Sequence, residues 1–66
     1  MSKIRIVIAD DHSLMRIGLK SFLSSVPGMD VVGEAENGEQ AVATVLSTRP
    51  DVVVMDLMMP VLNGAD

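Results

Sequence analysis

The chain alternates between short apolar runs and longer amphipathic stretches. Three runs rich in β-branched residues are predicted to form strands, at about residues 3–9, 31–35 and 51–55. Two stretches between them carry apolar residues three and four positions apart and are predicted to form helices, at about residues 13–25 and 38–48. Each crossover can therefore hold a helix, which is typical of parallel strands joined by right-handed connections.

The last apolar run lies between two aspartates, over residues 51–56 (DVVVMD). Its continuous apolar character indicates a strand that is buried on both faces. Asp56 is then expected at the carboxyl end of the strand, where open α/β sheets bind their ligands. A single aspartate at a strand end is more often structural than functional, so the rest of the chain has to decide its role.

Both predicted helices have an apolar stripe that is expected to face the sheet. In the first helix the stripe consists of Met15, Leu19, Phe22 and Val26, and in the second of Ala41, Val42, Val45 and Leu46. Gly18 lies on the inner side of the first helix, where the missing side chain is expected to allow a close approach to a strand. Leu14 and Ile17 fall outside the stripe, and they either form a contact surface for another protomer or pack under a neighbouring loop.

Carboxylates follow two of the three predicted strands. Asp10 and Asp11 come after the first strand and Asp56 after the third. In a doubly wound sheet of strand order 2-1-3 these strands are neighbours, and their carboxyl ends meet at the topological switch point. Each pair of like charges at ~4 Å costs about 4 kcal/mol at an effective dielectric constant of 20, so such a cluster holds protons or attracts a hard cation. Its oxygen ligands suit Mg²⁺, and a carboxylate beside Mg²⁺ is a credible nucleophile toward a phosphoryl group.

Length, charge and composition narrow the class of protein. Sixty-six residues are expected to form one small domain, over residues 1–66, without a second domain. The stability of so small a domain is marginal, and a partner surface or a metal is expected to contribute to it. The net charge is −4 and the basic residues are scattered without an aromatic platform, which argues against nucleic-acid binding by this segment. No signal peptide or membrane-spanning stretch is visible, so a cytoplasmic location is expected.

Taken together, these motifs resemble the receiver domain of two-component response regulators. The matching stretches are the acidic pair after the first strand, residues 35–38 (AENG), residues 50–51 (PD) and residues 55–60 (MDLMMP) followed by Gly64. Residues 9–12 (ADDH) and 32–35 (VGEA) look like the receivers that precede a LuxR/FixJ-type helix-turn-helix domain. The resemblance covers the whole chain, which corresponds to about the first half of a receiver. It implies the first half of a flavodoxin-like doubly wound α/β fold, with a three-stranded parallel sheet of order 2-1-3 and two helices.

The resemblance also implies a role for each acidic residue. Asp56 would be the phosphoacceptor, which takes a phosphoryl group from a histidine kinase as an acyl phosphate. Asp11 would bind Mg²⁺ directly, and Asp10 directly or through a water. Asp56 and the backbone carbonyl of Met58 would complete the protein's share of the coordination. The module would not be an enzyme, and in the full-length protein it would control transcription through a DNA-binding domain.

The family's switch hydroxyl and its phosphate-pairing lysine would lie beyond Asp66, so half of the charge compensation is missing from this chain. This favours a second hypothesis, a half-domain that self-associates without phosphoryl chemistry of its own. Its third strand would be an exposed edge, which is a template for pairing with another chain, and a homodimer or larger assembly is expected.

Other readings of the acidic residues are weaker. A phosphatase of the haloacid-dehalogenase type would need Asp-x-Asp on one strand end, whereas Asp10 and Asp11 are contiguous. A dinucleotide fold would need Gly-x-Gly-x-x-Gly after the first strand. Asp10 and Asp11 could also stabilise the N-terminus of the first helix, a role that is compatible with a metal site. His12 is expected to open that helix rather than to transfer protons.

Overall fold

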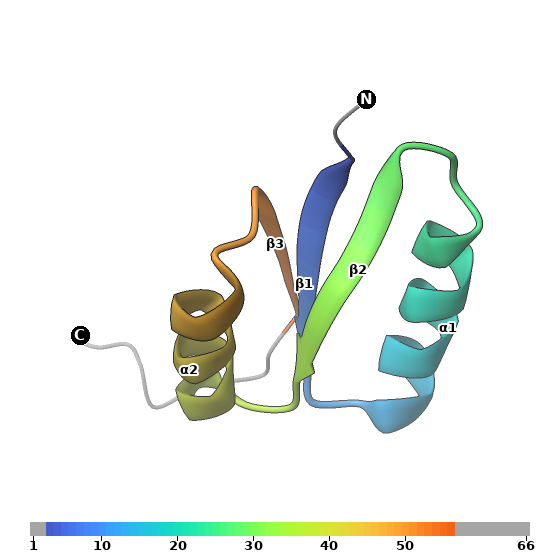
Figure 1. Cartoon of the computed structure of the whole chain (residues 1–66). Helices are drawn as coiled ribbons and strands as arrows, with labels where there is room; N and C mark the ends of the chain where they lie inside the picture. Colours follow the sequence, from blue (N-terminus) through green and yellow to red (C-terminus); the bar gives the residue numbers. More distant parts are fainter. Residues whose placement is uncertain (1–2, 57–66) are drawn as a thin grey trace.

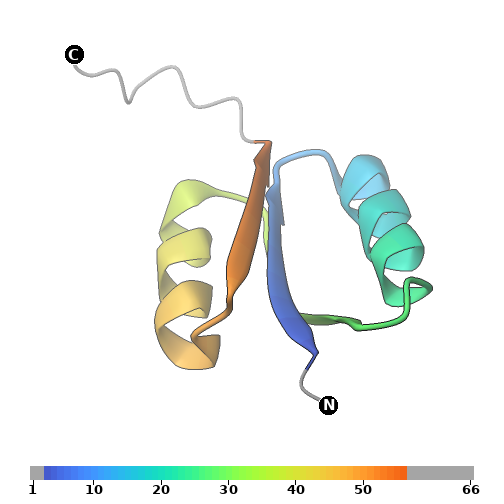
Figure 2. The same cartoon turned by 90° about the horizontal axis from the view of Figure 1, so that it is seen from above.

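Three parallel strands form the centre of the structure, a computed structural model that describes residues 3–56. The elements in chain order are β1 (Ile4–Asp10), α1 (Ser13–Ser24), β2 (Met29–Ala35), α2 (Gly38–Thr48) and β3 (Val52–Asp56). The strand order is β2-β1-β3, and β1 pairs in parallel with both neighbours. Helix α1 covers one face of the sheet and α2 the other (Figures 1 and 2). The predicted α/β fold with strand order 2-1-3 is confirmed, and the largest shift in a strand boundary is at β2, which begins at Met29 rather than Val31.

The core of the molecule is β1. This strand has a neighbour on each side and a helix over each face, so its side chains are removed from water in both directions. Its residues from Ile6 to Ala9 are at most 3% exposed, and Asp10 at its carboxyl end is 0% exposed. Ala35 of β2 and Ala41 of α2 extend this core beside Ala9. The central strand therefore ends in a buried carboxylate.

The apolar stripe predicted for α1 is wrong in part. Met15 and Phe22 are 53% and 65% exposed, whereas Leu19 and Val26 are half-buried. Arg16 takes an inward position instead, with a side chain that is only 17% exposed. A charged partner on β2 explains this arrangement, because the Arg16 guanidinium lies beside the Glu34 carboxylate. Helical periodicity alone does not reveal such a partner.

Leu14 and Ile17 remain on the outside of α1, at 83% and 61% exposure. No other part of residues 3–56 covers them, so packing under a loop is not seen within the described residues. The stripe predicted for α2 is also only partly inward: Ala41 is buried and Val45 half-buried, whereas Val42 and Leu46 are exposed.

Two glycines behave differently from the sequence-based expectation. A Cβ atom at Gly18 would have nothing within 4 Å, so the close approach predicted there does not occur. The tight contact is at Gly33 in β2, where an added Cβ would lie 2.5 Å from Cγ2 of Thr44 in α2. The β1–β2 register shifts just before this point, between Ile6 and Val7. Gly33 thus follows an irregularity in the ladder and lets α2 lie close to the sheet.

Strand β3 is less buried than predicted. Val52 and Met55 are 46% and 59% exposed, and Val53 and Val54 are half-buried. Within residues 3–56, β3 pairs only with β1, so one of its edges has no strand beside it. The prediction of a strand buried on both faces is therefore wrong for the described part of the chain. In the same part, no helix is both long and apolar enough to cross a membrane.

Candidate functional site

Strands β1 and β3 end side by side, each with an aspartate. Asp10 and Asp56 are register partners in the parallel ladder, so their Cα atoms lie at paired positions at the carboxyl edge of the sheet. At this edge the connection from β1 leads to α1 on one face of the sheet, and the connection from β2 leads to α2 on the other face (Figure 2). The convergence of the two strand ends, predicted from the β-α-β-α-β pattern, is present in the structure.

Asp10 is the buried member of the site. Its Oδ1 accepts a hydrogen bond of 2.8 Å from the backbone N–H of His12. Its Oδ2 is buried and has no hydrogen-bond partner among the described residues. Burying a carboxylate oxygen without a partner costs several kcal/mol of desolvation free energy, and a cation or a hydrogen-bond donor at the oxygen offsets this cost. A ligand at this oxygen is therefore expected on physical grounds.

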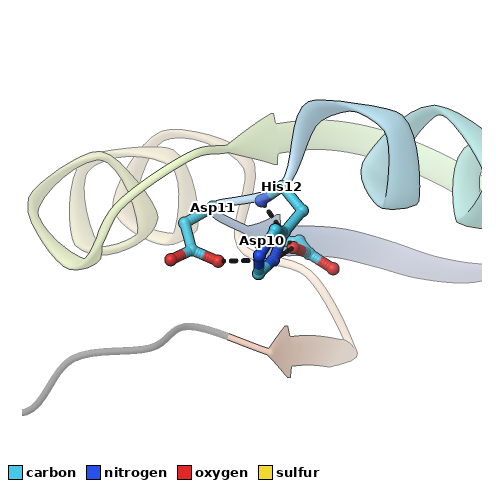
Figure 3. Close-up of side chains that lie close together, drawn as sticks. All are labelled: Asp10, Asp11 and His12. Carbon is cyan, nitrogen blue, oxygen red and sulfur yellow. Dashed lines mark hydrogen bonds and ion pairs between the residues drawn. The ribbon is translucent and has the colours of Figure 1, made fainter.

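His12 lies between the two neighbouring aspartates (Figure 3). Its Nδ1 is 3.0 Å from Oδ1 of Asp11 and 3.5 Å from Oδ1 of Asp10. One ligand atom from each of these three residues falls within a 4.8 Å group, the kind of cluster that can hold a metal ion. The side chains of Asp11 and His12 are 34% and 65% exposed, so the cluster is reached from solvent on their side. Sequence reasoning placed His12 only at the start of the helix and missed its contact with both carboxylates.

The donor set fits Mg²⁺. Asp10 and Asp11 supply hard carboxylate oxygens, and Oδ2 of Asp10 is buried without a hydrogen-bond partner in the described part of the chain. The exposed side leaves room for the waters that Mg²⁺ retains. The imidazole nitrogen of His12 is a softer donor and suits transition metals better. Asp56 is not a member of the 4.8 Å group. Met58, whose backbone carbonyl was predicted as a further ligand, lies outside the described residues.

Asp10 also stabilises the start of α1, as anticipated. His12 is the N-cap residue of α1 and its side chain makes no capping hydrogen bond, and the first turn contains no acidic residue. The Asp10 carboxylate instead accepts the N–H of His12 from outside the helix. A carboxylate near a helix N-terminus interacts favourably with the macrodipole, and this role is compatible with a metal site at the same residue.

Arg16 is a residue of the site that the sequence did not reveal. Its Nη1 donates a 2.8 Å hydrogen bond to the backbone carbonyl of Asp10. Its Nε lies 3.4 Å from Oε1 of Glu34, and Lys20 Nζ lies 2.9 Å from the other oxygen of that carboxylate. The sequence does show a basic residue about one helical turn after the acidic pair. The direction of its side chain, however, depends on Glu34, which lies in a different strand.

Comparison with known proteins identifies the family. Residues 6–66 match the response regulator receiver domain. The chain belongs to this family. The receiver is also similar in structure to the response regulator domain of Thermotoga maritima CheB, with a TM-score of 0.84 and 45% identity over 94% of this chain and 46% of that one. The flavodoxin-like architecture implied by the sequence is consistent with this match.

Curated relatives of the receiver include regulators of more than one kind. The transcriptional regulatory protein DegU of Brevibacillus brevis is 48% identical over 98% of this chain and 28% of its own length. The nitrate/nitrite response regulator protein NarL of Escherichia coli K12 is 44% identical, over 92% of this chain and 28% of that protein. A protein-glutamate methylesterase/protein-glutamine glutaminase of Carboxydothermus hydrogenoformans is 47% identical, over 97% of this chain and 19% of that protein. This chain thus spans less than a third of the length of each of these relatives.

Proposed function

We propose that this receiver accepts a phosphoryl group on Asp56, with Mg²⁺ held by Asp10 and Asp11. The observation that supports this most directly is the pairing of Asp56 with the buried Asp10 at adjacent strand ends. Asp56 is exposed, so a phosphodonor can reach its carboxylate, while one carboxylate oxygen of Asp10 has no hydrogen-bond partner among residues 3–56. Nucleophile and metal ligands then share one edge of the sheet.

Each residue has a distinct task in the proposed transfer. A carboxylate oxygen of Asp56 forms a bond to phosphorus while the phosphorus–nitrogen bond to a kinase histidine breaks, and the nitrogen keeps the electron pair. The product is an acyl phosphate on Asp56. Mg²⁺ would offset the charge of the phosphoryl oxygens. Asp10 and Asp11 would hold the ion, together with Asp56 and the backbone carbonyl of Met58, and the Asp10 hydrogen bond from His12 keeps that carboxylate in place.

The proposal extends to the larger system in which a receiver works. The donor would be a histidine kinase in the cytoplasm. The output would be transcription through a DNA-binding domain, a proposal supported by the regulator names of DegU and NarL. Residues 1–66 would act as one unit without enzymatic activity of their own and without contacting nucleic acid.

Intact mass spectrometry after incubation with acetyl phosphate and Mg²⁺ tests the phosphoacceptor. The wild-type chain should gain the mass of one phosphoryl group, and Asp56→Asn should gain none. Asp30→Asn is the matched control, because Asp30 is an exposed aspartate on β2 away from the site. Gain in Asp56→Asn would contradict the assignment. If only a full-length version gained the phosphoryl mass, phosphorylation would require the longer protein.

A second function, self-association, is favoured by the apolar surface at β3. Val42 and Leu46 of α2 and Met55 of β3 are 61%, 71% and 59% exposed. With neighbouring apolar residues they line a hollow of about 230 Å³ between helix and strand. β3 lines this hollow, and within residues 3–56 one of its edges has no strand beside it, so a second copy of the chain could add a strand there and cover exposed side chains at the same time.

Light scattering distinguishes a self-associating chain from a monomer. We expect a mass of two chains or more that falls on dilution. Val42→Asp should lower the assembled fraction by placing an unpaired charge in the interface. Ala43→Asp, at an exposed position of the same helix outside this hollow, is the control. A monomeric mass at all concentrations would rule out self-association.

A further inference from the structure

Arg16 connects the acidic site to a different strand from the two that carry its aspartates. The guanidinium donates from Nη1 to the backbone carbonyl of Asp10, at 2.8 Å, and places Nε 3.4 Å from Oε1 of Glu34. Asp10 ends β1, Glu34 lies in β2, and Arg16 itself is in α1. One side chain therefore ties the site-bearing end of β1 to the adjacent strand and to the helix that follows.

The contact suits the chemistry of arginine. Guanidinium is planar and presents five donors in a fixed fork, so it can hold two acceptors in a defined relative position, whereas a lysine ammonium offers a single point of charge. The Arg16 side chain is only 17% exposed, which limits competition from water at both contacts. Its backbone N–H also donates to the carbonyl of His12, at 2.9 Å, so the residue is fixed at its main chain as well.

The peptide that follows Asp10 links the two carboxylates of the site. Asp10 and Asp11 are consecutive, so a change in the backbone torsions on either side of this peptide would move their side chains relative to each other. The carbonyl that Arg16 holds belongs to this peptide. Metal sites need their ligands held to about 0.5 Å by surrounding contacts, and loss of such a contact typically lowers metal affinity about 10- to 100-fold.

We propose that Arg16 is a positioning residue for the acidic site, which clamps the Asp10–Asp11 peptide against Glu34 so that both carboxylates stay directed at one cation. This inference rests on the proposed Mg²⁺ site at Asp10 and Asp11. It concerns a residue that touches neither the metal nor the reacting atoms.

Lys20 provides a matched control. It lies in the same helix as Arg16 and contacts the same carboxylate, with Nζ 2.9 Å from Oε2 of Glu34. It makes no hydrogen bond to Asp10 among the described residues. Arg16→Met and Lys20→Met each remove one cation and one contact with Glu34, but only Arg16→Met removes the clamp on Asp10.

The first measurement is Mg²⁺ affinity by calorimetric titration. Arg16→Met should bind Mg²⁺ about 10- to 100-fold more weakly than wild type, and Lys20→Met should stay close to wild type. Arg16→Lys keeps the charge near Glu34 without the fork and should also be weakened. Equal affinities for wild type and Arg16→Met, equal losses in both methionine variants, or full affinity in Arg16→Lys would each overturn the proposal.

The second measurement does not depend on the metal. The His12 N–H bonds to the Asp10 carboxylate, so its hydrogen exchange, followed by NMR without Mg²⁺, reports whether the Asp10 segment is held. Exchange at His12 should be faster in Arg16→Met than in Lys20→Met, relative to the remaining amides of α1. A uniform change over α1 in both variants indicates loss of the helix contact only and contradicts the clamp. If the wild type binds no Mg²⁺, the proposed function fails, and the exchange comparison still decides the role of Arg16.

Discussion

The side chain of His12 joins the carboxylates of Asp10 and Asp11, with its Nδ1 3.0 Å from Asp11 Oδ1 and 3.5 Å from Asp10 Oδ1. A cation bound by the two carboxylates therefore shares their oxygens with the imidazole. Removing the imidazole should leave both carboxylates free for the ion. We expect His12→Ala to bind Mg²⁺ at least as tightly as wild type, and to lose affinity for Zn²⁺, for which the imidazole nitrogen is a good ligand. Parallel titrations with the two metals measure this, and weaker Mg²⁺ binding would show that the imidazole supports the site.

Asp10→Asn should stabilise the protein in the absence of metal. Asp10 is fully buried, one of its oxygens has no hydrogen-bond partner within residues 3–56, and the substitution removes its charge beside Asp11. We expect the free energy of unfolding to rise by about 1–3 kcal/mol in urea titrations with a chelator present. Asp30→Asn, at an exposed position, should change it little. A loss of stability in Asp10→Asn would mean that the charge itself is needed for folding.

Mg²⁺ should stabilise the wild type by mass action. A cation that binds only the folded chain adds about 2.7 kcal/mol at 100 times its dissociation constant. The thermal midpoint should therefore rise with Mg²⁺ and return to its starting value with a chelator. Asp10→Asn and Asp11→Asn should lose most of this response. The same ionic strength of KCl serves as the control, and an equal shift with KCl would indicate simple charge screening.

Gly33→Ala should destabilise the protein, because the new methyl group would lie 2.5 Å from Cγ2 of Thr44. Overpacking of this kind costs about 1–3 kcal/mol. Gly18→Ala is the contrasting variant, since its Cβ meets nothing within 4 Å, and alanine in a helix interior should add about 0.5–1 kcal/mol of stability. Replacing Thr44 by Ser in the Gly33→Ala background should recover part of the loss in urea unfolding. Additive effects of the two changes would show that Thr44 is not the obstacle.

Asn37 caps α2, and its removal should weaken the helix. Its side-chain oxygen accepts the backbone N–H of Gln40 at 2.8 Å. Asn37→Ala should cost about 1 kcal/mol in the free energy of unfolding. Asn37→Asp retains the acceptor and adds a negative charge at the helix N-terminus, so it should preserve stability. A loss in Asn37→Asp as large as that in Asn37→Ala would show that the acceptor is not what matters.

Sequence reasoning predicted the five elements well, because they follow from local rules, and it predicted the meeting of the strand ends from the doubly wound strand order 2-1-3. β-branched runs and helical spacing define the five elements, and the strand order then places Asp10 beside Asp56. It failed where a side chain's direction depends on a partner far along the chain. Arg16 turns inward because Glu34 is there.

The same limit applies to close contacts and to exposure. Periodicity placed Gly18 against the sheet, whereas the approach of Thr44 makes Gly33 the tight position. The apolar run at β3 predicted burial on both faces, but burial depends on neighbours that residues 3–56 supply on one side only. The phosphoacceptor role of Asp56 stays a prediction that the mass measurement with Asp56→Asn tests, and the metal-binding role of the Met58 carbonyl stays a prediction.

The central place of β1 has a consequence for synthesis on the ribosome. β1 is made first among the strands, yet its two neighbours, β2 and β3, follow only after one and two helices. At roughly 5–20 residues per second, β1 waits on the order of seconds for β3 after its own last residue has been added. Every strand pairing is long-range, so no local hairpin shortens that wait. During this interval β1, which becomes the most buried of the three described strands, has only the nascent α1, β2 and α2 to cover it.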